Sequence, residues 1–362
     1  MTSDCIPGDF LIFRIDQPVL SDELIVFLQE YRPVGIHFGK NAFLTNADYN
    51  VWLSAFRELR DAIRHAIGRD HIIWALDHEG GRVVRTPPPI TRFPYPMNWQ
   101  SMSHLVGYAM GMELESLGIN LLFGPSLDSP IDAQSGVIGP RAFACNPADV
   151  IKHSQSFLAS LKTHGIQAAV KHFPGHGGTS CDSHFDLPSL DMTYNELASR
   201  DMLPFTQAQA NGTDCVMFAH ILFRSIDAKH PASLSQVFHQ QILRGKLNFD
   251  GVTITDDLDM KSIAENYSAA DIAKSVIENE INFMIFNHSI DHAARVMDKL
   301  AKIIPEQANK SATISHRSST FIHQLADNDI TQLPASKLLD HESLARQIGE
   351  SYQVSIRDFD GD

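Results

Sequence analysis

The sequence has little of what marks a membrane or secreted protein. None of its apolar runs approaches the roughly 20 residues that a helix needs to span a bilayer. The first residues, MTSDCIPGDF, show no basic segment followed by an apolar one, which is the pattern of a secretory signal peptide. We therefore expect a cytoplasmic protein without a membrane partner.

Cysteine is equally scarce, with 4 in 362 residues. These four (Cys5, Cys145, Cys181 and Cys215) are widely spaced and form no CxxC pair, so neither a zinc ribbon nor a disulfide framework is expected. Positive charge is also limited: 29 Lys and Arg stand against 43 Asp and Glu, for a net charge of −14. An acidic protein repels a phosphate backbone, so nucleic acid is not expected as a partner.

What the chain does have is a regular alternation of short apolar runs with longer amphipathic segments. The runs are residues 9–15, 34–38, 71–76, 119–123, 166–170, 214–218, 251–255 and 281–286. Several of the helical patterns between them, among them 103–118, 149–165 and 193–212, end on Gly as helix C-caps do. Eight such units predict an α/β fold with a closed (β/α)8 barrel, and a doubly wound open sheet is the alternative.

The pattern predicts one catalytic barrel over residues 1–304. The polar segment 305–362 is expected to form a helical extension that packs on the barrel. Two connections, 77–102 and 171–193, are longer than βα loops usually are, and long loops in compact domains are usually functional.

The first candidate catalytic residue is Asp256, which directly follows the run GVTIT (251–255). Parallel barrels mount their catalytic groups at the carboxyl ends of the strands, where a carboxylate could attack carbon. Alternatively, Asp256 or Asp257 caps the next helix. We expect Asp256 to point into the barrel mouth and Asp257 to act as a cap or hydrogen-bond partner.

Four segments, taken together and in order, resemble glycoside hydrolase family 3. They are LDHEGGRVVR (76–85), VIGPRAF (137–143), KHFPGHG (171–177) followed by DSH (182–184), and LRGKLNFDGVTITDDLD (243–259). LRGKLNFDGVTITDDLD resembles the signature of the family, and KHFPGHG followed by DSH resembles in particular its β-N-acetylglucosaminidase branch, the β-hexosaminidases of peptidoglycan recycling. The resemblance implies that Asp256 is the nucleophile, His184 the general acid/base and Asp182 its orienting partner.

The implied roles agree with the chemistry of the side chains. An imidazole has a reference pKa of about 6.5, so His184 can donate a proton to a leaving oxygen and take one back from water. A simpler interpretation is a surface histidine of the loop. The resemblance also implies that five residues hold the sugar: Asp77, Arg85, Arg141, Lys171 and His172. Carboxylates that accept and cations that donate suit a polyol, although the same residues could form an ion-pair network of the barrel loops.

The sequence departs from the family pattern at three places. His78 stands where Gln is usual, Pro140 replaces an acidic residue, and GIHFGKN (35–41) replaces a segment with Ala-Arg before the Asn. These departures leave the aglycone open. The spacing of His172 and His176 resembles that of two metal ligands on a helix, but Pro174 and Gly175 interrupt any helix there, so neither a metal nor an organic cofactor is expected.

The resemblance implies a retaining exo-β-N-acetylglucosaminidase that acts, as a monomer, on N-acetylglucosaminyl-anhydromuramyl fragments in peptidoglycan recycling. Three alternatives stay open. Phosphate could cleave the intermediate, because a neutral His repels phosphate less than a carboxylate does. The enzyme could be another family 3 β-glycosidase, or the barrel could bind sugar without turnover.

Overall fold

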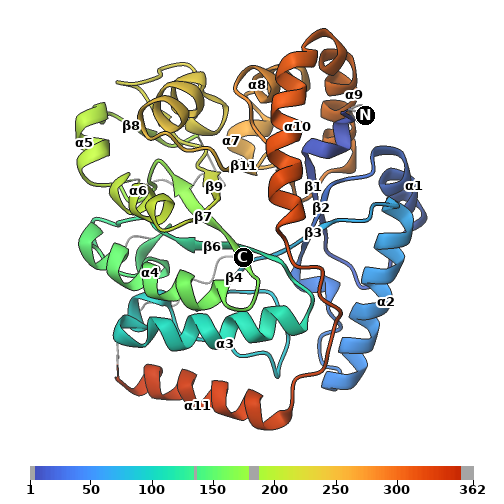
Figure 1. The fold of residues 1–362 in the computed structure, drawn as a ribbon, viewed down its shortest axis with the longest axis vertical. Coiled ribbons are helices and arrows are strands. Elements are labelled where there is room, and N and C mark those ends of the chain that lie inside the picture. The colour runs from blue at the N-terminus through green and yellow to red at the C-terminus, as the bar shows by residue number, and fades with distance from the viewer. Residues whose placement is uncertain (1–4, 134–136, 179–186, 352–362) are drawn as a thin grey trace.

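All eight apolar runs form parallel strands that close into one barrel (Figure 1). The computed structural model describes residues 5–133, 137–178 and 187–351. In barrel order the strands are β1 (Leu11–Ile15), β2 (Gly35–Phe38), β3 (Ile73–Leu76), β6 (Leu121–Ser126), β7 (Gln167–Phe173), β9 (Cys215–Phe218), β11 (Val252–Asp257) and β12 (Phe283–Phe286). The predicted (β/α)8 barrel is confirmed, and the alternative of an open doubly wound sheet is wrong.

Helices surround the barrel and connect successive strands (Figure 1). They are α1 (Asp22–Tyr31), α2 (Tyr49–Ile67), α3 (Ser103–Ser116), α4 (Pro147–Lys162), α5 (Tyr194–Ser199), α6 (Leu203–Ala210), the π-helix η7 (Val237–Lys246), α7 (Lys261–Ala264), α8 (Ala269–Glu278) and α9 (Ile290–Glu306). Two further helices follow, α10 (Ala308–His323) and α11 (Ala335–Ser351). The segment after residue 304 thus contains helices, while its separation from the barrel as a second unit stays a prediction.

The helix predicted over 193–212 is two helices, α5 and α6. Arg200 leaves the helical region, with φ −132° and ψ −74°, and α6 begins at Leu203 with Pro204 in its first turn. Proline lacks the N–H that a continuous helix requires, and its ring would clash with the carbonyl of residue 200. In the first turn of a new helix neither defect matters, which explains the break.

The barrel interior is filled by alternate residues of the strands. Ala75, Phe123, Met217 and Ile254 belong to one buried apolar cluster, whereas their neighbours along each strand face the helices or carry polar groups. This period of two is the expected consequence of strand geometry. The same cluster includes Phe321 of α10, so α10 closes the end of the barrel at which the strands begin.

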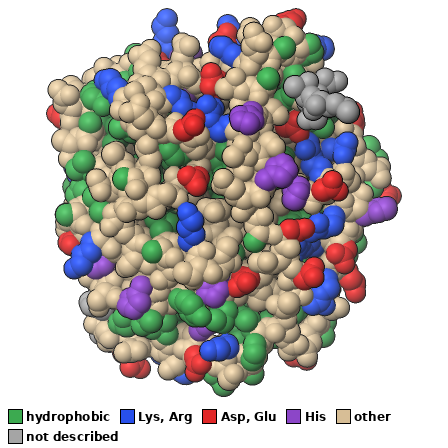
Figure 2. Space-filling model, viewed as in Figure 1, with side chains coloured by type: hydrophobic (Ala, Val, Ile, Leu, Met, Phe, Trp, Pro, Cys, Tyr) green, Lys and Arg blue, Asp and Glu red, His purple; other side chains and the backbone are tan. Residues whose placement is uncertain are grey.

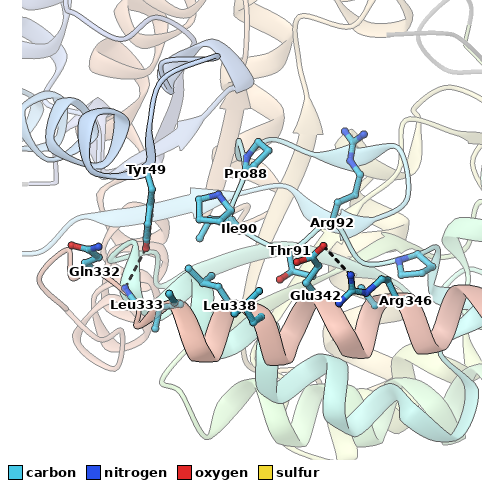
Figure 3. A pocket seen from close by; sticks show the side chains of 15 residues that line it. Tyr49, Pro88, Ile90, Thr91, Arg92, Gln332, Leu333, Leu338, Glu342 and Arg346 are labelled. Carbon is cyan, nitrogen blue, oxygen red and sulfur yellow. Dashed lines mark hydrogen bonds and ion pairs between the residues drawn. The ribbon is translucent and has the colours of Figure 1, made fainter.

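Helix α11 lies beside α3 (Figure 1) and contacts it through His341 and Glu113. His341 of α11 lies 2.8 Å from the buried carboxylate of Glu113, which also accepts hydrogen bonds from the backbone N–H and the hydroxyl of Thr91. Beside this contact, residues 88–94 and 332–346 line a largely apolar cavity of about 700 Å³ (Figure 3). Glu113 of α3 therefore bonds both to the long loop, through Thr91, and to the C-terminal helix, through His341.

The surface that Figure 2 shows carries acidic and basic side chains interspersed, with no continuous stripe of one sign on this face. Two small sheets lie outside the barrel: the hairpin β4 (His78–Gly80) and β5 (Val83–Val84), and the parallel pair β8 (Ser189–Leu190) and β10 (Leu222–Phe223). Within the described ranges no helix is both long and apolar enough to cross a membrane.

Candidate active site

The candidate residues converge on the end of the barrel where the strands finish. Asp77 directly follows β3, Lys171 and His172 lie in the last part of β7, and Asp256 is the next-to-last residue of β11. Parallel strands in a closed barrel bring their carboxyl ends to one rim, which explains how residues far apart in sequence meet here.

A half-buried carboxylate (Asp77), a buried one (Glu79) and two cations form a charged cluster at this rim. The Lys171 ammonium lies 2.8 Å from Asp77 Oδ1 and 2.7 Å from Glu79 Oε1. The Arg141 guanidinium makes two parallel hydrogen bonds of 2.8 Å to the two oxygens of Glu79. Planar pairing of this kind fixes the orientation of both groups. Arg141 and Lys171 are therefore brought together through Glu79.

The charges of the cluster hold each other ionised. Burial raises the pKa of Asp77, but the charge of Lys171, followed by the hydrogen bond and charge of His37 and the charge of Arg85, lowers it well below its usual value. Burial likewise raises the pKa of Glu79, and Arg141 and Lys171 lower it to about 2. In Lys171 burial lowers the pKa, and Asp77 and Glu79 raise it above its ordinary value. The cluster carries fixed charges at neutral pH, as a site that binds a neutral polyol requires.

Arg85 reaches the rim through the β4–β5 hairpin. The turn of this hairpin contains Gly80 and Gly81, with φ of 88° and 57°, a region that favours glycine. A Cβ at Gly81 would also collide with the ring of Tyr95. The EGG sequence therefore allows the chain to reverse tightly between Asp77 and Arg85.

His172 is held by a buried aspartate. Its Nδ1 atom lies 2.7 Å from Asp128 Oδ2, and the other oxygen of Asp128 accepts a hydrogen bond of 2.6 Å from the backbone N–H of His176. Burial raises the pKa of Asp128, and His172, with the hydrogen bonds, lowers it to about 2. Burial and then the charge of His172 lower the pKa of His176 to about 4. Asp128 thus orients the imidazole of His172 and braces the start of the loop.

Asp256 lies across the rim from this cluster and is half-buried. Its Oδ1 atom accepts a hydrogen bond of 2.8 Å from the backbone N–H of Asp257. Burial raises its pKa, but His220, His172 and Lys171 lower it below the ordinary value. An ionised carboxylate near Lys171 and His172 can act as a nucleophile toward a sugar that these two residues hold.

The neighbouring Asp257 has a different environment. It is buried, and its Oδ1 accepts hydrogen bonds from the backbone N–H groups of Asp259 and Asn287 at 3.0 and 3.1 Å. Burial, followed by the charges of Asp259 and Asp256, raises its pKa to about 7. The two adjacent carboxylates therefore have different roles: Asp257 is a hydrogen-bond acceptor that positions the backbone, while Asp256 faces the rim.

Asp182 and His184 lie outside the described residues, so the proposed dyad stays a prediction. The other candidate residues, Asp77, Arg85, Arg141, Lys171, His172 and Asp256, are described and gather at one end of the barrel. Sequence reasoning missed Glu79 and His37. Glu79 stands inside the LDHEGGRVVR segment, which could have indicated it. His37 lies in the divergent segment 35–41, where the sequence shows only a polar residue within an apolar run.

The sequence matches a known protein family. Residues 36–318 match the model of the glycosyl hydrolase family 3 N-terminal domain. The chain is 32% identical over 252 residues to a β-hexosaminidase of Nitrosospira multiformis, which covers 67% of this chain and 72% of the relative. The chain therefore belongs to glycosyl hydrolase family 3.

Solved structures agree with this assignment. A family 3 β-N-acetylglucosaminidase from Paenibacillus sp. is 25% identical with a TM-score of 0.84, over 97% of this chain and 68% of that one. NagZ from Neisseria gonorrhoeae, solved in complex with zinc ion, is 25% identical with a TM-score of 0.77, over 96% and 99% of the two chains. The family predicted from the motifs is confirmed, and the protein is a glycoside hydrolase similar to the β-hexosaminidases.

Proposed function

We propose that this protein is a retaining exo-β-N-acetylglucosaminidase that works through a covalent glycosyl-enzyme. The observation that carries the proposal is the convergence of an ionised Asp256 with the charged cluster of Asp77, Arg141 and Lys171 at one barrel rim. A cluster of this composition suits the hydroxyls of one sugar ring, and the carboxylate suits attack on its C1.

The reaction then has two steps. In the first, an oxygen of Asp256 bonds to C1 while the bond from C1 to the leaving oxygen breaks, and His184 protonates that oxygen. In the second, His184 takes a proton from water, whose oxygen bonds to C1 and releases the carboxylate of Asp256. We assign Asp182 the role of orienting His184. Two inversions at C1 give net retention.

The proposed substrate is a peptidoglycan fragment with terminal N-acetylglucosamine on an anhydromuramyl unit, cleaved in the cytoplasm by a monomeric enzyme. The proposal is supported by the β-hexosaminidase relatives, one of which is 32% identical to this chain over 252 aligned residues. No organic cofactor or metal is assigned a step in it.

The central test is Asp256→Ala, assayed by release of nitrophenol from the β-N-acetylglucosaminide. Loss of the nucleophile should lower kcat at least about 1,000-fold. Asp250→Ala is the matched control, because this aspartate precedes the same strand with a side chain that is 96% exposed. Equal turnover of wild type and Asp256→Ala would remove Asp256 from the mechanism.

Product analysis separates the remaining alternatives. Proton NMR of the first product should show the β-anomer of free N-acetylglucosamine, at a rate independent of added phosphate. A sugar 1-phosphate formed only with phosphate would establish phosphorolysis. Faster cleavage of a β-glucoside or β-xyloside than of the β-N-acetylglucosaminide would indicate another family 3 β-glycosidase, and tight binding without turnover a silent sugar-binding barrel.

A further inference from the structure

A buried histidine that belongs to none of the motif segments lies against the charged cluster. His37 is in β2, is 2% exposed, and its Nε2 atom lies 3.1 Å from Asp77 Oδ2. The other oxygen of Asp77, Oδ1, accepts the hydrogen bond from Lys171. Asp77 is therefore held from two sides, by a cation and by an imidazole.

The second ring nitrogen of His37 is anchored as well. Its Nδ1 atom lies 2.9 Å from the side-chain oxygen of Asn287, directly after β12. The backbone N–H of Asn287 in turn donates to Asp257, the residue after Asp256. The ring also packs against Phe123, with 4.9 Å between ring centroids. A continuous chain of contacts thus runs around the rim from Asp77 to the residue beside Asp256.

The geometry explains what this chain of contacts can do for sugar binding. An ionised carboxylate has about four lone-pair sites on its two oxygens. With one site on each oxygen of Asp77 directed to the protein, the plane of the carboxylate is fixed and the remaining sites can face the barrel mouth. A carboxylate held only by Lys171 could still rotate about that single contact. Fixing it in advance lowers the entropy that binding would otherwise cost.

We propose that His37 is a positioning residue for the sugar, with its ring oriented by Asn287 and its Nε2 atom paired with Asp77. Both neighbours are acceptor oxygens, so the paired ring carries a proton on each nitrogen. The contact of Nε2 with Asp77 is a close ion pair and not an aligned hydrogen bond. The inference rests on the proposed function, in which Asp77 binds sugar hydroxyls, and deepens it. A purely apolar side chain would fill the same space between β2 and Phe123 but would leave Oδ2 of Asp77 without this ion-pair partner.

Two substitutions can separate the roles of the two ring nitrogens of His37. The side-chain amide of Gln reaches the position of Nε2, whereas that of Asn reaches the position of Nδ1. His37→Gln keeps a donor for Asp77 and should stay within about threefold of wild-type KM. His37→Leu and His37→Asn lose that donor, and losing one polar contact to a charged group should raise KM roughly tenfold. We expect kcat to change by less than about threefold, because Asp77 does not contact the bond that breaks.

The control is His153→Leu, which removes another buried imidazole, on α4. It should leave KM unchanged, and thermal melts of all variants would identify any that fail to fold. Equal KM values for the Leu and Gln variants, or a fall in kcat at unchanged KM, would overturn the proposal.

A second measurement does not depend on activity. In ¹⁵N NMR spectra of the wild type, with His37 assigned from the His37→Gln spectrum, Nε2 should carry a proton and shift on Asp77→Asn. A bare Nε2, or one insensitive to Asp77, would overturn the inference. If the wild type releases no N-acetylglucosamine while Nε2 behaves as expected, the proposed function fails and the contact between His37 and Asp77 stands.

Discussion

Two groups of carboxylates lie at the same end of the barrel and lose water on folding, yet their pKa values shift in opposite directions. Asp77, half-buried, and Glu79, buried, lie beside Lys171 and Arg141, and their pKa values fall. Asp257 is buried with no Lys or Arg at hydrogen-bond distance among the described residues, and the exposed imidazole of His288 lies 3.6 Å from its Oδ2. Its pKa rises to about 7. Burial is common to both groups, so the partners of a carboxylate decide whether it is charged.

The comparison assigns different tasks to the two regions. Fixed charges around Asp77 provide a binding surface that does not change near neutral pH. The region around Asp257 concentrates negative charge beside Asp256, and a proton on Asp257 relieves the repulsion. Lys171 supplies the cation of the first region, and Asp257 is the titrating group of the second. A third buried carboxylate, Glu113, has His341 as its partner. Replacing each of these groups tests the comparison.

The largest effect is expected from Lys171→Met, which leaves Asp77 and Glu79 without their shared cation. Breaking a buried ion pair from one side should lower the free energy of unfolding by about 3–5 kcal/mol, as measured by urea unfolding at pH 7. Lys246→Met, at a cation that contacts the Tyr194 ring, should cost less than about 1 kcal/mol. Equal losses for the two variants would contradict the comparison.

The same variant has a defined pH dependence. Because the pKa values of Asp77 and Glu79 are lowered in the folded protein, their contribution to stability is present above their ordinary pKa of about 4 and is lost as pH falls toward 2. The difference in stability between wild type and Lys171→Met should therefore shrink between pH 5 and pH 2. A constant difference would mean that the ion pairs are not its source.

An intermediate effect of opposite sign is expected from Asp257→Asn. The folded-state pKa of about 7 lies above the ordinary value, so this group favours folding below about pH 4 and loses that contribution as pH rises through 7. The wild type should lose stability relative to Asp257→Asn between pH 5 and pH 8, by an amount on the order of a few kcal/mol. Unfolding curves at both pH values, with Asp250→Asn as control, measure it; a pH-independent difference would place the titration elsewhere.

The smallest effect is expected from His341→Ala, at the contact between α11 and Glu113. Glu113 keeps its two hydrogen bonds from Thr91, so the loss should be about 1–2 kcal/mol, with kcat/KM within twofold of wild type. His104→Ala, at an exposed histidine in the first turn of α3, the helix that carries Glu113, should leave stability unchanged. A large fall in kcat/KM would show that α11 acts on the site through the loop.

The pattern of apolar runs was sufficient to predict the barrel, because each strand is recognisable from its own five to seven residues. The break in the helix predicted over 193–212 also has a local cause. Pro204 is visible in the sequence, but the amphipathic pattern on both sides of it is compatible with one continuous helix. The site was harder, since Lys171 and Asp77 are 94 residues apart and His172 and Asp128 are 44 apart.

What the sequence by itself determined is the set of strands, the family, and which residues follow a strand end, because these depend on local periodicity and on motifs. Only the tertiary structure decided that Glu79 joins Arg141 to Lys171 and that His37 meets Asp77. Closing the barrel brings strand ends together in an order that no single segment encodes, and at such short range burial and charge set each pKa.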